Sequence, residues 1–106
     1  MKILFDQGTP VPLRHHLSPH TVETAYEKGW SDFKNGDLLA RAEAEGFDTL
    51  ITTDQNLRHQ QNLAGRRIGV VVLMTTNWPR IRGQLLLVVQ ALDASRPGSY
   101  EEVVFP

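Results

Sequence analysis

The sequence predicts a single α/β domain with three layers, in which a mostly parallel sheet lies between two layers of helices. Short apolar or β-branched runs alternate along the chain with amphipathic or polar segments. Such alternation is typical of parallel strands joined by helices, with right-handed crossovers. The length of 106 residues is that of one ordinary domain, so we expect residues 1–106 to share one hydrophobic core.

The first half of the chain has the pattern of three strands and two helices. An apolar run that ends at Asp6 and a Gly-Thr-Pro turn is typical of a buried strand. Proline at position 10 or 12 suits the first turn of a short helix that ends at Leu17. Apolar residues on one face predict a second helix, which Gly46 ends. The expected strands are Lys2–Phe5, His20–Ala25 and Phe47–Thr53, and the longer helix is Asp37–Glu45.

The second half predicts two helices and two strands. The run Ile68–Met74 is apolar on both faces, as expected of a central parallel strand. The segment Leu85–Val89 is either heavily buried or offers an apolar face to a partner protein or to a second copy in a homodimer. The expected helices are Asn56–Leu63 and Ile81–Ala94, and the last, edge strand is Tyr100–Phe105.

The composition excludes several classes of protein. Because the chain has no cysteine, it has no disulfide scaffold, no thiolate nucleophile and no cysteine zinc site. No apolar run approaches the ~20 residues that span a bilayer. The apolar run within Met1–Asp6 is too short for a secretory signal. We therefore expect a cytoplasmic protein with no membrane partner.

Charge is distributed unevenly along the chain. Residues 1–54 carry nine acidic and five basic side chains, whereas residues 55–92 carry five arginines and no acid. This pattern predicts either a carboxylate site beside a cationic rim or ordinary surface charge spread over several helices.

Carboxylates stand where a parallel sheet binds its ligands, beyond the carboxyl ends of the strands. Asp6 follows the first predicted strand, Asp54 follows the third, and Asp37 opens the helix between them. Taken singly, each can be a helix cap, a partner of the helix dipole or a turn residue. Three close carboxylates, however, repel one another unless a cation neutralises them. Mg²⁺ or Mn²⁺ is the cation that suits oxygen ligands.

A divalent ion at such a site suggests phosphate chemistry, because it polarises a phosphoryl oxygen and activates water. Thr53 supplies a hydroxyl beside Asp54 and Asn56 supplies an amide, so both are candidate substrate-binding residues. Arg58 lies one helical turn beyond Asp54, and an arginine fork suits a phosphate diester. The alternative for Arg58 is a solvated helix face.

Three segments, Met1–Asp6, Gly36–Leu39 and Leu50–Asn56, together resemble the PIN-like nuclease superfamily. They are most similar to a small bacterial branch linked to toxin–antitoxin systems. The resemblance implies a metal-dependent endoribonuclease, in which Asp6, Asp37 and Asp54 hold the metal and carry the catalysis. It also implies an in-line attack by water on an RNA phosphodiester, which leaves a 5′-phosphate and a 3′-hydroxyl. Its expected partners are RNA and an antitoxin protein.

The chain also departs from the family pattern. It is shorter than typical members, and Asn56 is the nearest substitute for a fourth carboxylate after Asp54. A catalytically inactive PIN-like protein that binds RNA or a protein partner is therefore the alternative. A phosphorylated signalling receiver shares acids after its first and third strands. However, Gln7 stands where a receiver needs a second acid, and no lysine follows the fifth predicted strand.

Overall fold

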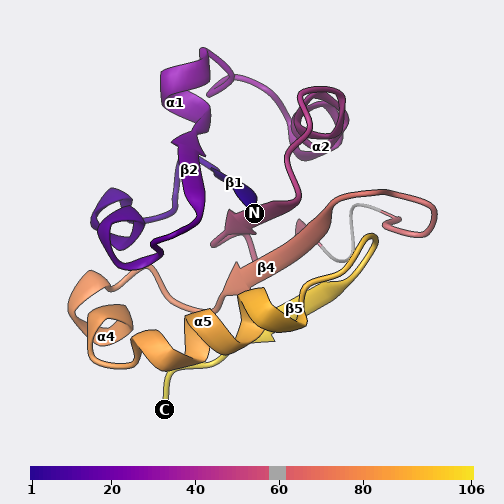
Figure 1. The fold of residues 1–106 in the computed structure, drawn as a ribbon. Helices are drawn as coiled ribbons and strands as arrows, with labels where there is room; N and C mark the ends of the chain where they lie inside the picture. Colours follow the sequence, from indigo (N-terminus) through magenta and orange to yellow (C-terminus); the bar gives the residue numbers. More distant parts are fainter. Residues whose placement is uncertain (58–61) are drawn as a thin grey trace.

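A computed structural model of the chain describes residues 1–57 and 62–106 (Figure 1). Five strands form one sheet in the order β2-β1-β3-β4-β5, and every neighbouring pair is parallel. The predicted α/β class is therefore confirmed, and each predicted strand is present. The strands are β1 (Lys2–Phe5), β2 (Thr21–Thr24), β3 (Thr49–Thr52), β4 (Gly69–Leu73) and β5 (Tyr100–Val103).

The helices of the described residues fill the connections between these strands. Most of the predicted helix Asn56–Leu63 lies outside the described residues. The helical segments are the 3₁₀ helix η1 (Val11–His16), and the α-helices α1 (Ala25–Lys28), α2 (Asn35–Ala44), α4 (Trp78–Arg82) and α5 (Leu85–Ala94).

Two apolar clusters cover the two faces of the sheet. On one face, strand residues such as Phe5 and Val71 pack against η1, α4 and α5. On the other face, alternate residues such as Leu4 and Val70 pack against α1 and α2. All five residues of β4 are buried, as predicted for a central strand. The helices therefore form two layers around the sheet, which Figure 1 shows with α2 and α5 on opposite faces.

The crossovers of this sheet do not share one hand. The connection from β1 to β2 carries η1, and the connection from β4 to β5 carries α4 and α5 over the same face. However, β2 lies on one side of β1, whereas β5 extends the sheet in the opposite direction. The two crossovers therefore have opposite hands, so the expectation of uniformly right-handed crossovers is wrong for this chain.

Two helix boundaries also differ from the prediction. Helix α2 begins at Asn35, two residues before the predicted start. The single predicted helix Ile81–Ala94 is two helices, α4 and α5, which are separated by two residues. Helix α4 begins early because the Asn77 side chain accepts the Arg80 N–H at 3.0 Å and Pro79 suits a first helical turn.

Among the helices of residues 1–57 and 62–106, none combines the length and the apolar character that a membrane crossing needs.

Glu43 connects α2 to the segment that precedes β4. Its carboxylate forms an ion pair with Arg66 and accepts the Arg67 N–H at 2.7 Å. Burial raises the pKa of Glu43, but these hydrogen bonds and the two arginine charges outweigh burial and lower it below its ordinary value of 4.5. A lowered folded-state pKa contributes stability above the unfolded-state pKa, and this stability is lost as the pH falls through the folded-state pKa.

We predict that Glu43→Gln lowers the free energy of unfolding at pH 7 by about 1–3 kcal/mol, because it weakens a nearly buried, charge-assisted contact. The loss should shrink as the pH falls below 4.5. Denaturant unfolding at pH 7 and at pH 3.5 measures both effects. Glu45→Gln is the matched control, because Glu45 is half exposed and meets Lys28 at 3.7 Å, so its removal should cost under ~1 kcal/mol. Equal effects of the two substitutions would contradict the role of Glu43.

Candidate functional site

The carboxyl ends of β1 and β3 lie side by side at the point where the strand order reverses. The chain passes from β1 to β2 on one side and returns to β3 on the other, so the switch point lies between β1 and β3. Asp6 directly follows β1, and Asp54 lies two positions beyond β3. Since Phe5 pairs with Ile51, Asp6 comes opposite Thr52. Ligands of open α/β sheets bind at such a point, as the sequence predicts for Asp6 and Asp54.

Three donors surround the Asp6 carboxylate. Its Oδ1 atom accepts the Gly8 N–H at 3.2 Å and lies 2.8 Å from the Thr9 hydroxyl. Its Oδ2 atom accepts a hydrogen bond from the Thr52 hydroxyl. Thr9 and Thr52 are themselves buried. The carboxylate is therefore held in one orientation by groups that belong to the core of the domain.

Burial raises the pKa of Asp6 above its ordinary value of 3.8, although hydrogen bonds from Thr52, Thr9 and Gly8 act in the opposite direction. A buried carboxyl whose pKa stays raised despite its donors is a costly group to keep ionised. Perturbed carboxyls in clefts are candidates for functional groups. A nearby cation would lower this pKa and stabilise the ionised form.

The turn after Asp6 packs directly on the turn after β3. A Cβ atom added to Gly8 would lie 2.6 Å from the Thr53 Oγ1 atom and 3.9 Å from Asp6 Oδ1. The turn therefore needs glycine at this position, because a side chain would push Thr53 away. Thr53, predicted as a substrate-binding residue, is half-buried and lies beside Asp6.

Asp54 is oriented by two amides. Its Oδ2 atom accepts a hydrogen bond from Asn35 Nδ2 at 2.7 Å, and its Oδ1 atom accepts the Asn56 N–H at 2.9 Å. Asn35 reaches Asp54 from the first turn of α2. Asn56, a predicted substrate-binding residue, thus contacts the site through its backbone, while its side chain is exposed.

The hydroxyl of Thr52 links the two acids. It donates its proton to Asp6 Oδ2, and it accepts the N–H of Asp54 at 3.0 Å. Thr52 is fully buried between the turns that follow β1 and β3. The position of one acid is therefore coupled to the backbone of the other by a single side chain.

Asp37 lies apart from this pair. It is exposed in the first turn of α2 and lines a different hollow, together with Phe33 and Arg41. Residues two apart on an α-helix point about 200° away from each other. Because Asn35 faces Asp54, Asp37 faces elsewhere. Within the ranges 1–57 and 62–106, no three His, Cys, Asp or Glu side chains are grouped so as to hold a metal.

The remaining predicted residue, Arg58, lies outside the described residues. Asn35 was absent from the sequence-based candidates. The signal that could have found it is helical periodicity, because Asn35 and Asp37 cannot both face the strand ends. Of the predicted residues, the structure thus brings Asp6, Thr53 and Asp54 to one place.

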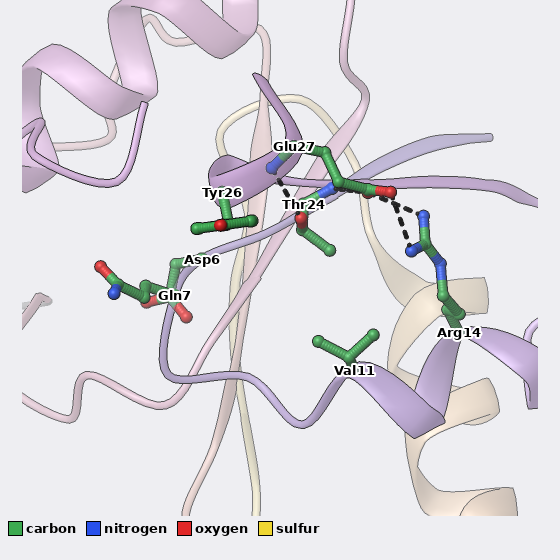
Figure 2. Close-up of a pocket in the computed structure, with 7 residues that line it drawn as sticks. All are labelled: Asp6, Gln7, Val11, Arg14, Thr24, Tyr26 and Glu27. Atoms are coloured by element: carbon green, nitrogen blue, oxygen red, sulfur yellow. Dashed lines mark hydrogen bonds and ion pairs between the residues drawn. The ribbon is translucent and has the colours of Figure 1, made fainter. Parts of the chain in front are cut away.

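A cavity of about 350 Å³ opens beside Asp6 (Figure 2). It lies at the carboxyl ends of β1 and β2, and sequence reasoning did not predict it. Figure 2 shows the Asp6 and Gln7 side chains at one end and the Arg14–Glu27 ion pair at the other. Its lining residues are Asp6, Gln7, Val11, Arg14, Thr24, Tyr26 and Glu27.

No protein-family model, no curated protein and no solved structure matches this chain.

We predict that the free energy of unfolding of Asp6→Asn increases relative to that of the wild type as the pH rises. The raised folded-state pKa of Asp6 means that its contribution to stability is present below pH 3.8 and is lost as the pH rises through the folded-state pKa. Each tenfold change in proton affinity corresponds to ~1.4 kcal/mol. Denaturant unfolding of both proteins from pH 3 to pH 8 measures the difference.

Asp37→Asn is the control for this series, because it removes an exposed carboxyl rather than a buried one, and we expect it to gain no stability over the wild type in this pH range. If the free energy of unfolding of Asp6→Asn, relative to that of the wild type, stays constant or falls as the pH rises, burial does not destabilise the ionised carboxyl.

Proposed function

We propose that this protein is a PIN-like, metal-dependent endoribonuclease that hydrolyses RNA phosphodiester bonds with Asp6 and Asp54. The observation that supports this proposal is the coupling of two acids by Thr52 at the switch point of a parallel sheet. One of these acids is a buried carboxyl with a raised pKa. Both acids follow strands that belong to the segments resembling PIN-like nucleases.

The donor set fits one Mg²⁺ or Mn²⁺ ion with few protein ligands. Asp6 and Asp54 offer carboxylate oxygens, and Thr53 offers a hydroxyl oxygen. Mg²⁺ is commonly held by one or two carboxylates, with waters and substrate phosphate as its other ligands. A bound ion lowers the pKa of water and stabilises the negative charge that develops on the phosphate. The position of Asp37 in another hollow gives no support to a centre of three carboxylates.

The residues of this chain have separate tasks in the proposal. Thr9, Thr52 and the Gly8 N–H hold the Asp6 carboxylate in place, so little reorganisation is needed when a cation and substrate bind. Asn35 and the Asn56 N–H orient Asp54 in the same way.

The contact between Gly8 and Thr53 keeps the two turns close at the mouth of the site. Arg58 is the proposed phosphate-binding residue. The proposed products are a 5′-phosphate and a 3′-hydroxyl.

A second candidate function is that of an inactive PIN-like protein which binds RNA or a partner protein. It is favoured by the hydrogen bonds that already occupy both carboxylates, and by the position of Asp37 in a different hollow. For either function we propose a cytoplasmic role in a toxin–antitoxin pair. Leu86 and Val104, 66% and 64% exposed, are candidates for contacts with an antitoxin protein or a second copy.

The test is cleavage of labelled single-stranded RNA by the purified protein with Mn²⁺, with Mg²⁺ and with EDTA. We expect cleavage that requires the metal and falls at least ~100-fold in Asp6→Asn and in Asp54→Asn, because each removes a group that acts directly in the reaction. Asp37→Asn is the matched control and should keep the wild-type rate.

Absence of metal-dependent cleavage by the wild type, with RNA binding or partner binding intact, would favour the inactive alternative. Loss of cleavage in Asp37→Asn would contradict a site of two carboxylates.

A further inference from the structure

The cavity beside Asp6 combines an exposed aromatic ring with a polar end. Tyr26 is 76% exposed, and Val11, a second apolar residue of the lining, is 49% exposed. In Figure 2 the ring of Tyr26 and the side chain of Val11 lie on opposite sides of the space. Gln7 adds an amide, which can donate and accept hydrogen bonds. An exposed ring next to such a hollow offers a flat surface on which a planar ligand can stack.

Hydrogen bonds from neighbouring elements fix the backbone around Tyr26. Thr24 and Glu27 form a reciprocal capping box around the first turn of α1, with hydrogen bonds of 3.1 and 2.9 Å. Arg14 then donates to both carboxylate oxygens of Glu27 and to the Val22 carbonyl. These contacts join η1, β2 and α1, so the backbone that carries Tyr26 is fixed although its ring is exposed.

The charges of the cavity wall exclude a phosphate from its interior. Two acids, Asp6 and Glu27, line it. Hydrogen bonds from Arg14, joined by the Thr24 N–H, hold the pKa of Glu27 below its ordinary value, so this acid stays ionised. Arg14 is the one basic side chain among the described lining residues, and its guanidinium is already bound to Glu27 and to a backbone carbonyl. A neutral planar group fits this wall, whereas an anion does not.

The size of the cavity suits one such group. Its volume of about 350 Å³ is at the low end of the ~300–1,000 Å³ typical of small-molecule sites. The cavity also shares Asp6 with the candidate catalytic site, so a ligand that fills it lies next to any phosphate held there.

We propose that this cavity binds one unpaired nucleobase of an RNA strand, stacked on Tyr26, beside the phosphate that is positioned at Asp6. This inference rests on the proposed function and adds to it a site for one base, which must be unpaired because a base within a duplex cannot enter the cavity. Stacking on an aromatic ring contributes to affinity for any base, while Gln7 is placed to contact the edge of the base.

The test is equilibrium binding, with Mn²⁺ present, of a fluorescent single-stranded RNA hexamer whose linkages resist hydrolysis, so that cleavage does not consume the ligand. Removal of one stacking ring weakens binding by roughly 5- to 150-fold, so we expect a loss in this range for Tyr26→Ala. Tyr26→Phe keeps the ring and should bind within about twofold of the wild type. Phe33→Ala is the matched control, because it removes another exposed aromatic ring, one that does not line this cavity, and it should bind normally. A hexamer without bases should bind the wild type as weakly as the intact hexamer binds Tyr26→Ala.

Wild-type affinity in Tyr26→Ala, or no binding of the hexamer by the wild type, would overturn the inference. Equal losses in Tyr26→Phe and Tyr26→Ala would also overturn it, because they would assign the effect to the hydroxyl.

Cleavage measured separately with Mn²⁺ distinguishes the two proposals. If the wild type binds through Tyr26 but never cleaves, the nuclease proposal fails and the base site stands. If it cleaves and Tyr26→Ala binds and cleaves normally, the base site fails alone.

Discussion

The hydrogen bonds of one buried hydroxyl organise the candidate site. Thr52 donates to the Asp6 carboxylate and accepts the backbone N–H of Asp54. This geometry requires β1 and β3 to be neighbours in parallel register, which the pairing of Phe5 with Ile51 establishes. The register depends in turn on apolar side chains that fill both faces of the sheet. The packing of the core thus fixes the relative position of two acids that are 48 residues apart in the sequence.

Much of the sheet could be predicted because its signal is local. Buried parallel strands need continuous apolar runs, and each run here ends at a turn or at an acid. The placement of Asp6 and Asp54 at one edge followed from the rule that ligands bind beyond the carboxyl ends of strands. The strands thus suffice to predict that these two acids share an edge, since both follow parallel strands of one sheet.

The remaining features depend on details that periodicity alone does not determine. A shift of two residues in the start of α2 turns Asn35 toward Asp54 and Asp37 away from it. The capping side chain of Asn77 starts α4 early. The hand of the last crossover depends on which face its helices cover, and both faces of β4 are apolar. The cavity beside Asp6 forms between β1, η1 and α1, so no single segment predicts it.

The burial of Asp6 makes a requirement of function costly for stability. Asp6 is surrounded by donors, yet burial still raises its pKa, so the ionised carboxyl destabilises the fold unless a cation is near. Such a cost is typical of functional sites rather than of structural ones. By contrast, Glu43 has a lowered pKa and strong partners, which is the pattern of a stabilising contact. A buried carboxyl that has an arginine partner, as Glu43 has, stabilises the fold. A buried carboxyl without one, such as Asp6, destabilises the fold and is a candidate for function.

Calorimetric titration of the wild type and of Thr52→Val with Mn²⁺ tests the central claim most directly. Groups that orient metal ligands change metal affinity by about 10- to 100-fold when they are removed. We therefore expect the wild type to bind one ion and Thr52→Val, correctly folded, to bind it at least ~10-fold more weakly. Equal affinities, or no binding of Mn²⁺ by the wild type, would contradict the claim that Thr52 joins Asp6 and Asp54 into one site.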